Sequence, residues 1–90
     1  MKIKEEATRL VLLTDDEKEV GEMTWSDAGD IMIIDHTFVD PAYRGQSLAE
    51  KLVYQGVEIA RRDNKKVLPL CPFAKKEFQE KPEYEDVLRK

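Results

Sequence analysis

Residues 31–53, IMIIDHTFVDPAYRGQSLAEKLV, decide the fold of this 90-residue chain. The first nine, Ile31–Val39, are mostly apolar and rich in β-branched side chains, so we expect a central strand that is buried on both faces. A Pro turn follows, and Gly45 then stands beside Arg44 where an amphipathic pattern begins. The stretch is either an ordinary strand-to-helix turn or a backbone loop shaped to hold a phosphate.

The residues after this loop predict a helix over 47–64 and a short buried strand over 65–70 (KKVLPL). Strand, helix and strand form a βαβ unit, so the last strand should run parallel to Ile31–Val39 through a right-handed crossover. Pro69 has no amide donor, so we expect either an edge strand or an interruption of strand pairing there. The apolar positions that recur at helical spacing are Ala49, Leu52, Val53, Gly56, Val57 and Ala60.

The remaining segments predict the rest of an α+β fold. Residues 8–14 and 19–25 read as strands joined by acidic and Gly/Asp turns, which makes an antiparallel meander of three strands with Ile31–Val39. Pro72 and Pro82 sit where short C-terminal helices would begin. We therefore expect a mixed sheet of about four strands, one of them parallel, with the main helix packed on one face.

The composition indicates one domain, residues 1–90, and excludes several classes of protein. The chain is 41% hydrophobic and 38% charged, and its formal net charge is −4, which argues against sequence-independent binding of nucleic acid. The basic residues within 60–66 suit a solvated helix end. No apolar run approaches the ~20 residues of a membrane span, and no secretory signal is visible. One cysteine cannot form an intrachain disulfide, so we expect a cytoplasmic protein.

The loop at residues 44–49 allows two interpretations. Ligands of a βαβ unit gather where a helix presents its free amide groups, and the helix dipole there favours an anion. Gly45 would let the backbone turn tightly and approach a ligand. Ser47 followed by Glu50 also fits a capping box, in which the helix satisfies its own amide donors.

The stretch VDPAYRGQSLAEKLV resembles the acetyl-coenzyme A motif of the GNAT N-acetyltransferase superfamily, with Arg44 in its first place and Ala49 in its last. Ser47 stands where the family usually has its middle glycine. Further segments, ARRDNKKVLPLCPFAKKEF and PEYEDVL, extend the likeness to a short single-domain branch of the superfamily. The resemblance covers roughly residues 31–88 and implies an acetyl-CoA-dependent N-acetyltransferase without a metal site.

The resemblance also implies which residues hold the cofactor. The loop would bind the pyrophosphate through backbone amides, and the end of the preceding strand would pair with the pantetheine arm. A backbone N–H near Val39 would polarise the thioester carbonyl. The implied cofactor-binding residues are Thr37, Phe38, Val39, Arg44, Gly45, Gln46, Ser47, Leu48 and Ala49.

Cys71 and His36 are the candidate catalytic residues. Cys71 would accept the acetyl group or give a proton to the leaving thiolate; a lone cysteine in an apolar strand is otherwise a small buried hydrophobe. His36 would relay a proton or activate Cys71, or is structural. Asp35 and His36 are neighbours, so in a regular strand they face opposite sides. Tyr84 would donate a proton to coenzyme A, the usual role of a tyrosine in the superfamily, or is a packing residue. The aromatic residues Trp25, Phe38, Phe73 and Phe78 are expected to pack in the core or line the cleft.

Three function classes follow. The first is an N-acetyltransferase acting on a small-molecule or peptide amine, as a monomer or a homodimer. The second is a module that binds coenzyme A or acyl-CoA without catalysis, which the short chain favours. The third is a structural domain without a ligand.

Overall fold

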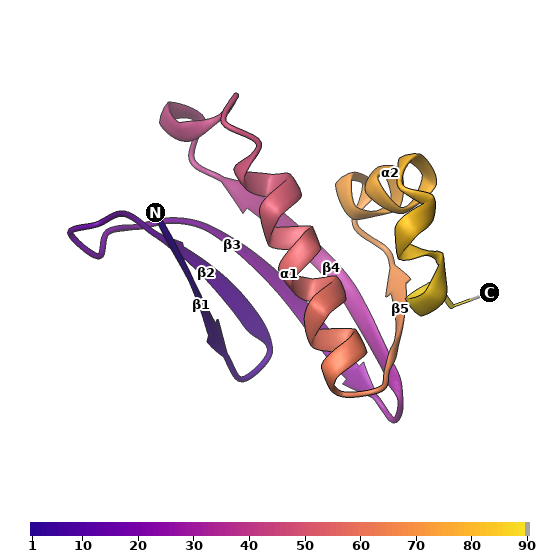
Figure 1. Ribbon diagram of the computed structural model, residues 1–90. Coiled ribbons are helices and arrows are strands. Elements are labelled where there is room, and N and C mark those ends of the chain that lie inside the picture. Colours follow the sequence, from indigo (N-terminus) through magenta and orange to yellow (C-terminus); the bar gives the residue numbers. More distant parts are fainter. Residues whose placement is uncertain (90) are drawn as a thin grey trace.

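The computed structural model describes residues 1–89, which form one five-stranded sheet with a long helix against it (Figure 1). Neighbouring strands follow the chain order, and all pairs are antiparallel except the last, β4 with β5. This arrangement confirms the expected α+β class with a βαβ crossover. The elements are β1 (Lys2–Glu6), β2 (Arg9–Leu13), β3 (Glu19–Ala28), β4 (Ile31–Val39), the 3-10 helix η1 (Pro41–Tyr43), α1 (Leu48–Arg62), β5 (Lys66–Pro69), α2 (Pro72–Glu80) and the 3-10 helix η2 (Pro82–Val87).

The strand β1 is an addition to the predicted meander, which thus has four antiparallel strands. It pairs with β2 from Lys2 opposite Leu13 to Glu6 opposite Arg9. Its sequence, KIKEE, carries four charged residues, because an edge strand needs little apolar surface. Only Ile3 packs against the main core.

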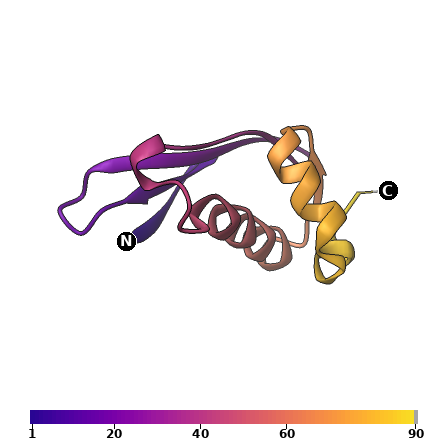
Figure 2. The same cartoon turned by 90° about the horizontal axis from the view of Figure 1, so that it is seen from above.

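The helix α1 covers one face of the sheet, and Figure 2 shows it on a single side of the strands. Met32 and Ile34 of β4 are fully buried under it, whereas Asp35 and His36 are exposed. The expectation that β4 is buried on both faces is therefore wrong, because the helices of this chain cover one face and leave the other to solvent. The buried residues of α1 are Leu48, Leu52, Val53, Gly56, Val57, Ile59 and Ala60.

A glycine fixes the close approach of β3 to β4. A Cβ built on Gly21 would lie 2.8 Å from the carbonyl oxygen of Phe38, a distance that real side chains essentially never show. Gly21 is paired with Val39, so this contact lies at the carboxyl end of β4. The end of β4 is thus held tightly on its β3 side.

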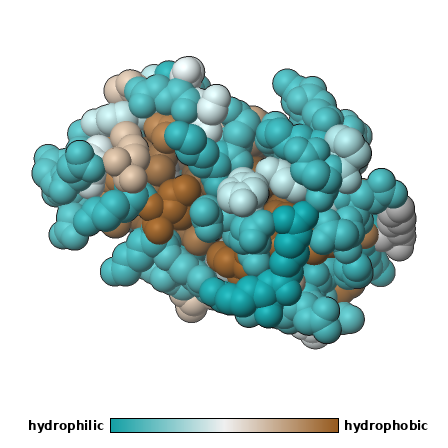
Figure 3. Space-filling model, in the orientation of Figure 1, coloured by the Kyte–Doolittle hydropathy of each residue, from teal (hydrophilic) through white to brown (hydrophobic). Residues whose placement is uncertain are grey.

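Surface ion pairs connect the C-terminal end of α1 to β1 and η2. Arg62 makes a two-pronged contact with Glu5 at 2.8 and 2.9 Å, and Arg61 contacts Asp86 at 2.9 and 3.0 Å. Arg61 and Arg62, which belong to the predicted solvated helix end, are therefore paired with acidic residues of the chain. The face that carries α1 is accordingly mostly hydrophilic in Figure 3, with smaller hydrophobic areas between the charged side chains.

Candidate functional site

The strands β4 and β5 separate part-way along the sheet. Their parallel pairing ends at Ile34 opposite Pro69, which is the interruption expected from the proline. The amides of Leu70 and Cys71 then both donate to the Ile34 carbonyl, at 2.9 and 3.1 Å, and the chain turns away into α2. Residues 35–39 of β4 continue past this point, as Figure 1 shows, with no strand beside them on the β5 side among residues 1–89.

The free edge of β4 presents backbone hydrogen-bonding groups. The amide of Asp40 donates to the Val20 carbonyl at 2.7 Å and so points toward β3. Successive residues of a strand point their backbone groups to opposite edges, so those of Thr37 and Val39 face away from β3. The Val39 carbonyl there accepts a hydrogen bond of 3.0 Å from Nε of Arg44.

A cleft of about 300 Å³ lies beside this free edge. Six of the nine predicted cofactor-binding residues line it: Thr37, Phe38, Val39, Arg44, Gly45 and Ala49. Gln46, Ser47 and Leu48 do not, and Leu48 is 4% exposed and belongs to the core. Phe73, which was expected in the core or the cleft lining, and Glu50 complete the lining. Glu50 was not predicted, because its approach depends on how α1 packs. A cavity of about 350 Å³ between α1 and the N-terminal strands lacks these residues.

The backbone of the loop is arranged as an anion site would need. Gly45 has a φ of +88°, and nothing lies within 4 Å of where its Cβ would be. Ser47 precedes α1 with a φ of +57°, a left-handed conformation that is costly for a serine. Its side chain makes no capping hydrogen bond, so the capping-box interpretation is wrong.

The amide groups at the start of α1 are free donors. The first hydrogen bond of the helix runs from the amide of Lys51 to the carbonyl of Ser47, at 3.2 Å. Within residues 1–89, no hydrogen bond uses the amides of residues 45–50. These donors and the positive end of the helix dipole lie beside the cleft, where they favour a phosphate group.

Cys71 lies at the fork but outside the lining of the cleft. It is the residue that precedes α2, its side chain is 8% exposed, and it belongs to the apolar core. The carbonyl of Cys71 accepts from the amide of Lys75 at 2.9 Å, while its thiol makes no capping bond. Phe73, two residues further on, does line the cleft.

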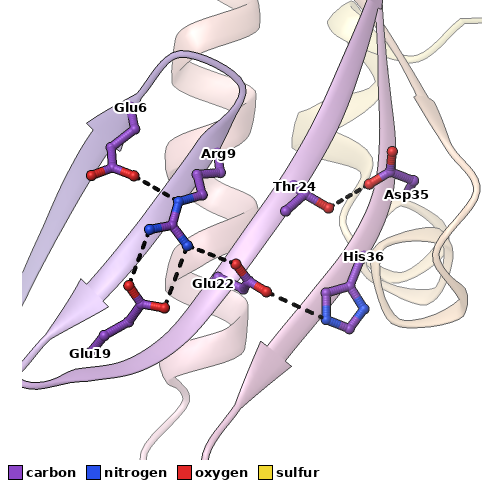
Figure 4. A network of polar contacts seen from close by, with 7 residues as sticks. All are labelled: Glu6, Arg9, Glu19, Glu22, Thr24, Asp35 and His36. Carbon is purple, nitrogen blue, oxygen red and sulfur yellow. Dashed lines mark hydrogen bonds and ion pairs between the residues drawn. The ribbon is translucent and has the colours of Figure 1, made fainter.

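His36 lies on the open face of the sheet, away from α1, as Figure 4 shows. Its Nε2 is 4.0 Å from a carboxylate oxygen of Glu22, and its ring stacks on Phe38 at 6.4 Å between centroids. Glu22 in turn takes a 2.9 Å hydrogen bond from Arg9. The described contacts do not bring His36 and Cys71 together.

A β-bulge places Asp35 on the same face as His36. Thr24 is opposite His36 and Trp25 is opposite Ile34, so Asp35 is an extra residue in β4. Its carboxylate accepts from the hydroxyls of Thr24 and Ser26 on the open face. The expectation that neighbouring Asp35 and His36 face opposite sides is wrong, because β4 is not regular at this point.

The aromatic candidates outside the cleft are structural. Trp25, Phe78 and Tyr84 belong to the core, and Tyr84 packs on Phe78 with 5.4 Å between ring centroids. Burial raises the pKa of the Tyr84 hydroxyl above its ordinary value. Phe38 is 43% exposed and lines the cleft.

Comparison with known proteins identifies the family. The family model "GCN5-related N-acetyl-transferase" matches residues 9–87. The chain belongs to the GCN5-related N-acetyltransferase (GNAT) family. It is therefore a member of an acyltransferase family whose cofactor is acetyl-CoA, and it shares the fold of its structural relatives.

Solved structures give the same assignment. A GCN5-like protein from Staphylococcus aureus superposes with a TM-score of 0.80 at 30% identity, over 98% of this chain and 87% of that one. A GNAT family N-acetyltransferase from Escherichia coli, solved in complex with CoA, superposes with a TM-score of 0.63 at 28% identity. The match covers 69% of this chain and 38% of that chain. A Mycobacterium tuberculosis protein in complex with CoA superposes with a TM-score of 0.67 at 25% identity. The match covers 81% of this chain and 46% of that chain. No curated protein sequence matches this chain.

The residues of the cleft fit coenzyme A. Its pyrophosphate matches the free amides beside Gly45, and its pantetheine arm has amides that can pair with the open edge at Thr37 and Val39. Within residues 1–89, no group of three or more His, Cys, Asp or Glu is placed to hold a metal ion. No helix in that part of the chain is both long and apolar enough to cross a bilayer.

Proposed function

We propose that this protein transfers the acetyl group of acetyl-CoA to an amine, with the cofactor held in the cleft between β4 and the N-terminus of α1. The observation that carries the proposal is the separation of β4 from β5 after Ile34 and Pro69, next to free helix amides. The residues of the chain bind and orient the thioester; the bound cofactor supplies the activated acetyl group. The proposed site of action is the cytoplasm.

The order of the cleft residues sets the direction of the cofactor. Residues 45–49 would hold the pyrophosphate, and Val39 and Thr37 would pair with the pantetheine arm in that order. The thioester then reaches the fork, where Ile34 holds the amide of Cys71. Amides at the edge of β4 would stabilise negative charge on the carbonyl oxygen during acyl transfer.

We assign Cys71 a role as acyl acceptor or as proton donor. As acceptor, its thiolate would attack the carbonyl carbon, the bond to the coenzyme A sulfur would break, and the amine would later take the acetyl group from Sγ. As donor, its thiol would give its proton to the departing sulfur. Both roles need Cys71, now 8% exposed, to become accessible when the cofactor binds.

Intact-protein mass spectrometry after incubation with acetyl-CoA separates the two roles of Cys71. An acetyl increment that is absent in Cys71→Ala and present in His36→Ala supports the acyl acceptor. An unmodified protein that still releases free coenzyme A in the presence of an amine supports direct transfer, in which Cys71→Ser retains more rate than Cys71→Ala.

A screen of small amines and peptide amines for release of free coenzyme A tests catalysis itself. The observation that favours the alternative, a non-catalytic binding module, is that neither Cys71 nor His36 lines the cleft. Binding of coenzyme A without turnover of any amine in the screen would establish that alternative. Absence of binding at millimolar coenzyme A would remove both functions.

A further inference from the structure

The side chain of Thr37 carries a polar atom that the fold leaves without a partner. Its hydroxyl oxygen is the one buried side-chain nitrogen or oxygen without a hydrogen bond in the part of the chain that the structure describes. A buried hydroxyl without a partner destabilises a fold, and native proteins carry few of them. Such an atom therefore calls for an explanation.

The position of Thr37 supplies the explanation. It lines the cleft beside the free edge of β4, while Met23 of β3 is its neighbour on the other side. Of the β4 residues that line the cleft, Thr37 lies nearest the fork at Ile34, and Val39 lies nearest the loop of Arg44. The orphaned hydroxyl is thus at the inner end of the cleft, remote from the phosphate end.

We infer that the Thr37 hydroxyl donates a hydrogen bond to the thioester carbonyl oxygen of acetyl-CoA and so selects the acylated over the free cofactor. This inference rests on the proposed function, which places the pyrophosphate at the loop and the thioester at the fork. The hydroxyl has no intramolecular acceptor to give up, so its proton is available to a ligand carbonyl. Free coenzyme A has a thiol at this point and offers a far weaker acceptor.

A small movement brings the hydroxyl to the ligand. The methyl and hydroxyl groups of threonine share one carbon. Rotation by one staggered position about χ1 can move the hydroxyl into the place of the methyl group, and the methyl group into that of the hydrogen, without moving the backbone. Thr37 already lines the cleft, so such a rotation needs no rearrangement of β4. The hydroxyl has already lost its contact with water on folding. A hydrogen bond to a ligand therefore does not have to overcome the cost of removing that water.

Calorimetric titration of Thr37→Val with acetyl-CoA and with coenzyme A tests the inference. Valine keeps the shape of threonine and removes the hydroxyl. We expect the Kd for acetyl-CoA to rise about threefold to tenfold, as for loss of one neutral hydrogen bond, and the Kd for coenzyme A to stay within about twofold. Thr37→Ser, which keeps a hydroxyl, should retain the preference for acetyl-CoA.

Stability supplies a second readout that a purely structural role would not give. Removing an unpaired buried hydroxyl should leave the urea midpoint of Thr37→Val unchanged or raise it, so that weaker acetyl-CoA binding accompanies an undamaged fold. Thr24→Val is the matched control, because the Thr24 hydroxyl bonds Asp35 on the open face and lies outside the cleft. It should change neither Kd.

The outcomes separate this inference from the proposed function. Equal losses for acetyl-CoA and coenzyme A in Thr37→Val, or no loss for either, would overturn the role of Thr37 while wild-type binding leaves the proposed function standing. Wild-type protein that binds neither ligand would overturn both. Loss of binding together with a lowered urea midpoint in both Thr37 variants would show a structural role instead.

Discussion

The Nε atom of Arg44 lies 3.0 Å from the carbonyl oxygen of Val39, so the arginine of the loop closes onto the free edge of β4. This hydrogen bond occupies an acceptor that the pantetheine arm would use. It also holds the guanidinium next to the free amides at the start of α1, where a pyrophosphate would sit. Arg44 is thus placed to occupy the Val39 carbonyl in the free protein and to attract the phosphates of the cofactor by its charge.

Replacing Arg44 by methionine should weaken coenzyme A binding by about 1.4 kcal/mol, a factor of ten, because a charge-assisted contact to phosphate is lost. The loss should shrink at high salt, which screens the charge. Calorimetry at low and high salt measures both effects. Lys51→Met removes the same charge from the first turn of α1 at a side chain outside the cleft and should cost much less; an equal loss would refute a specific role for Arg44.

Replacing Glu50 by glutamine should have the opposite effect on binding. Its carboxylate lines the cleft in the first turn of α1 and repels an incoming phosphate. We expect Glu50→Gln to tighten coenzyme A binding by about 0.5 to 1 kcal/mol at low salt. The same change should lower the unfolding free energy slightly, because a negative side chain stabilises a helix N-terminus. Weaker binding of Glu50→Gln at low salt would contradict the placement of the phosphates.

Replacing Ser47 by glycine should stabilise the protein. Ser47 has a φ of +57° and no capping hydrogen bond, so serine there has a strained backbone without compensation. Glycine adopts this conformation freely, and we expect the unfolding free energy in urea to rise by about 1 kcal/mol. Ser26→Gly, in β3, is the matched control and should have the opposite sign. A drop in stability for Ser47→Gly would show that the serine side chain makes a stabilising contact.

Those parts of the fold and of the site that local sequence patterns encode could be predicted from the sequence. The β4–loop–α1 unit follows from an apolar run, a Gly-containing turn and a helical stripe, all of them local patterns. Six of the nine residues predicted to bind the cofactor line the cleft for the same reason. The split at Pro69 was also predictable, because proline lacks the amide that a strand partner needs.

Other features depend on tertiary contacts that no local pattern reports. β1 is an edge strand with one apolar contact residue, Ile3, and so carries almost no hydrophobic signal. The bulge at Asp35 arises from the register of β3 against β4 and reverses the expected direction of a side chain. Ser47 even carries a misleading signal, since serine before a helix normally caps it. The burial of Cys71 follows from the packing of α2.

Stability in acid should depend on the ion pair between Glu5 and Arg62. The hydrogen bond from Arg62 lowers the pKa of Glu5 below its ordinary 4.5, and Arg61 likewise lowers that of Asp86. A lowered folded-state pKa gives stability that is present above the unfolded pKa and lost as the pH falls through the folded one. The urea midpoint should therefore fall as the pH drops below about 4.5, and less steeply in Glu5→Gln.

The control for this pH dependence is Asp30→Asn, since the Asp30 carboxylate makes no ion pair within residues 1–89. This variant should keep the acid dependence of the wild type. If Glu5→Gln and the wild type lose stability in parallel between neutral pH and about pH 3.5, the contact between β1 and α1 makes no net contribution.

The central claim is that the edge of β4 and the start of α1 bind coenzyme A. Amide-resolved NMR titration of the ¹⁵N-labelled protein with coenzyme A tests it most directly. The account predicts saturable shifts at the amides of Thr37, Val39 and residues 45–50, with small changes on β1 and η2. Binding that perturbs other surfaces and spares these amides, or no binding at millimolar coenzyme A, would contradict it.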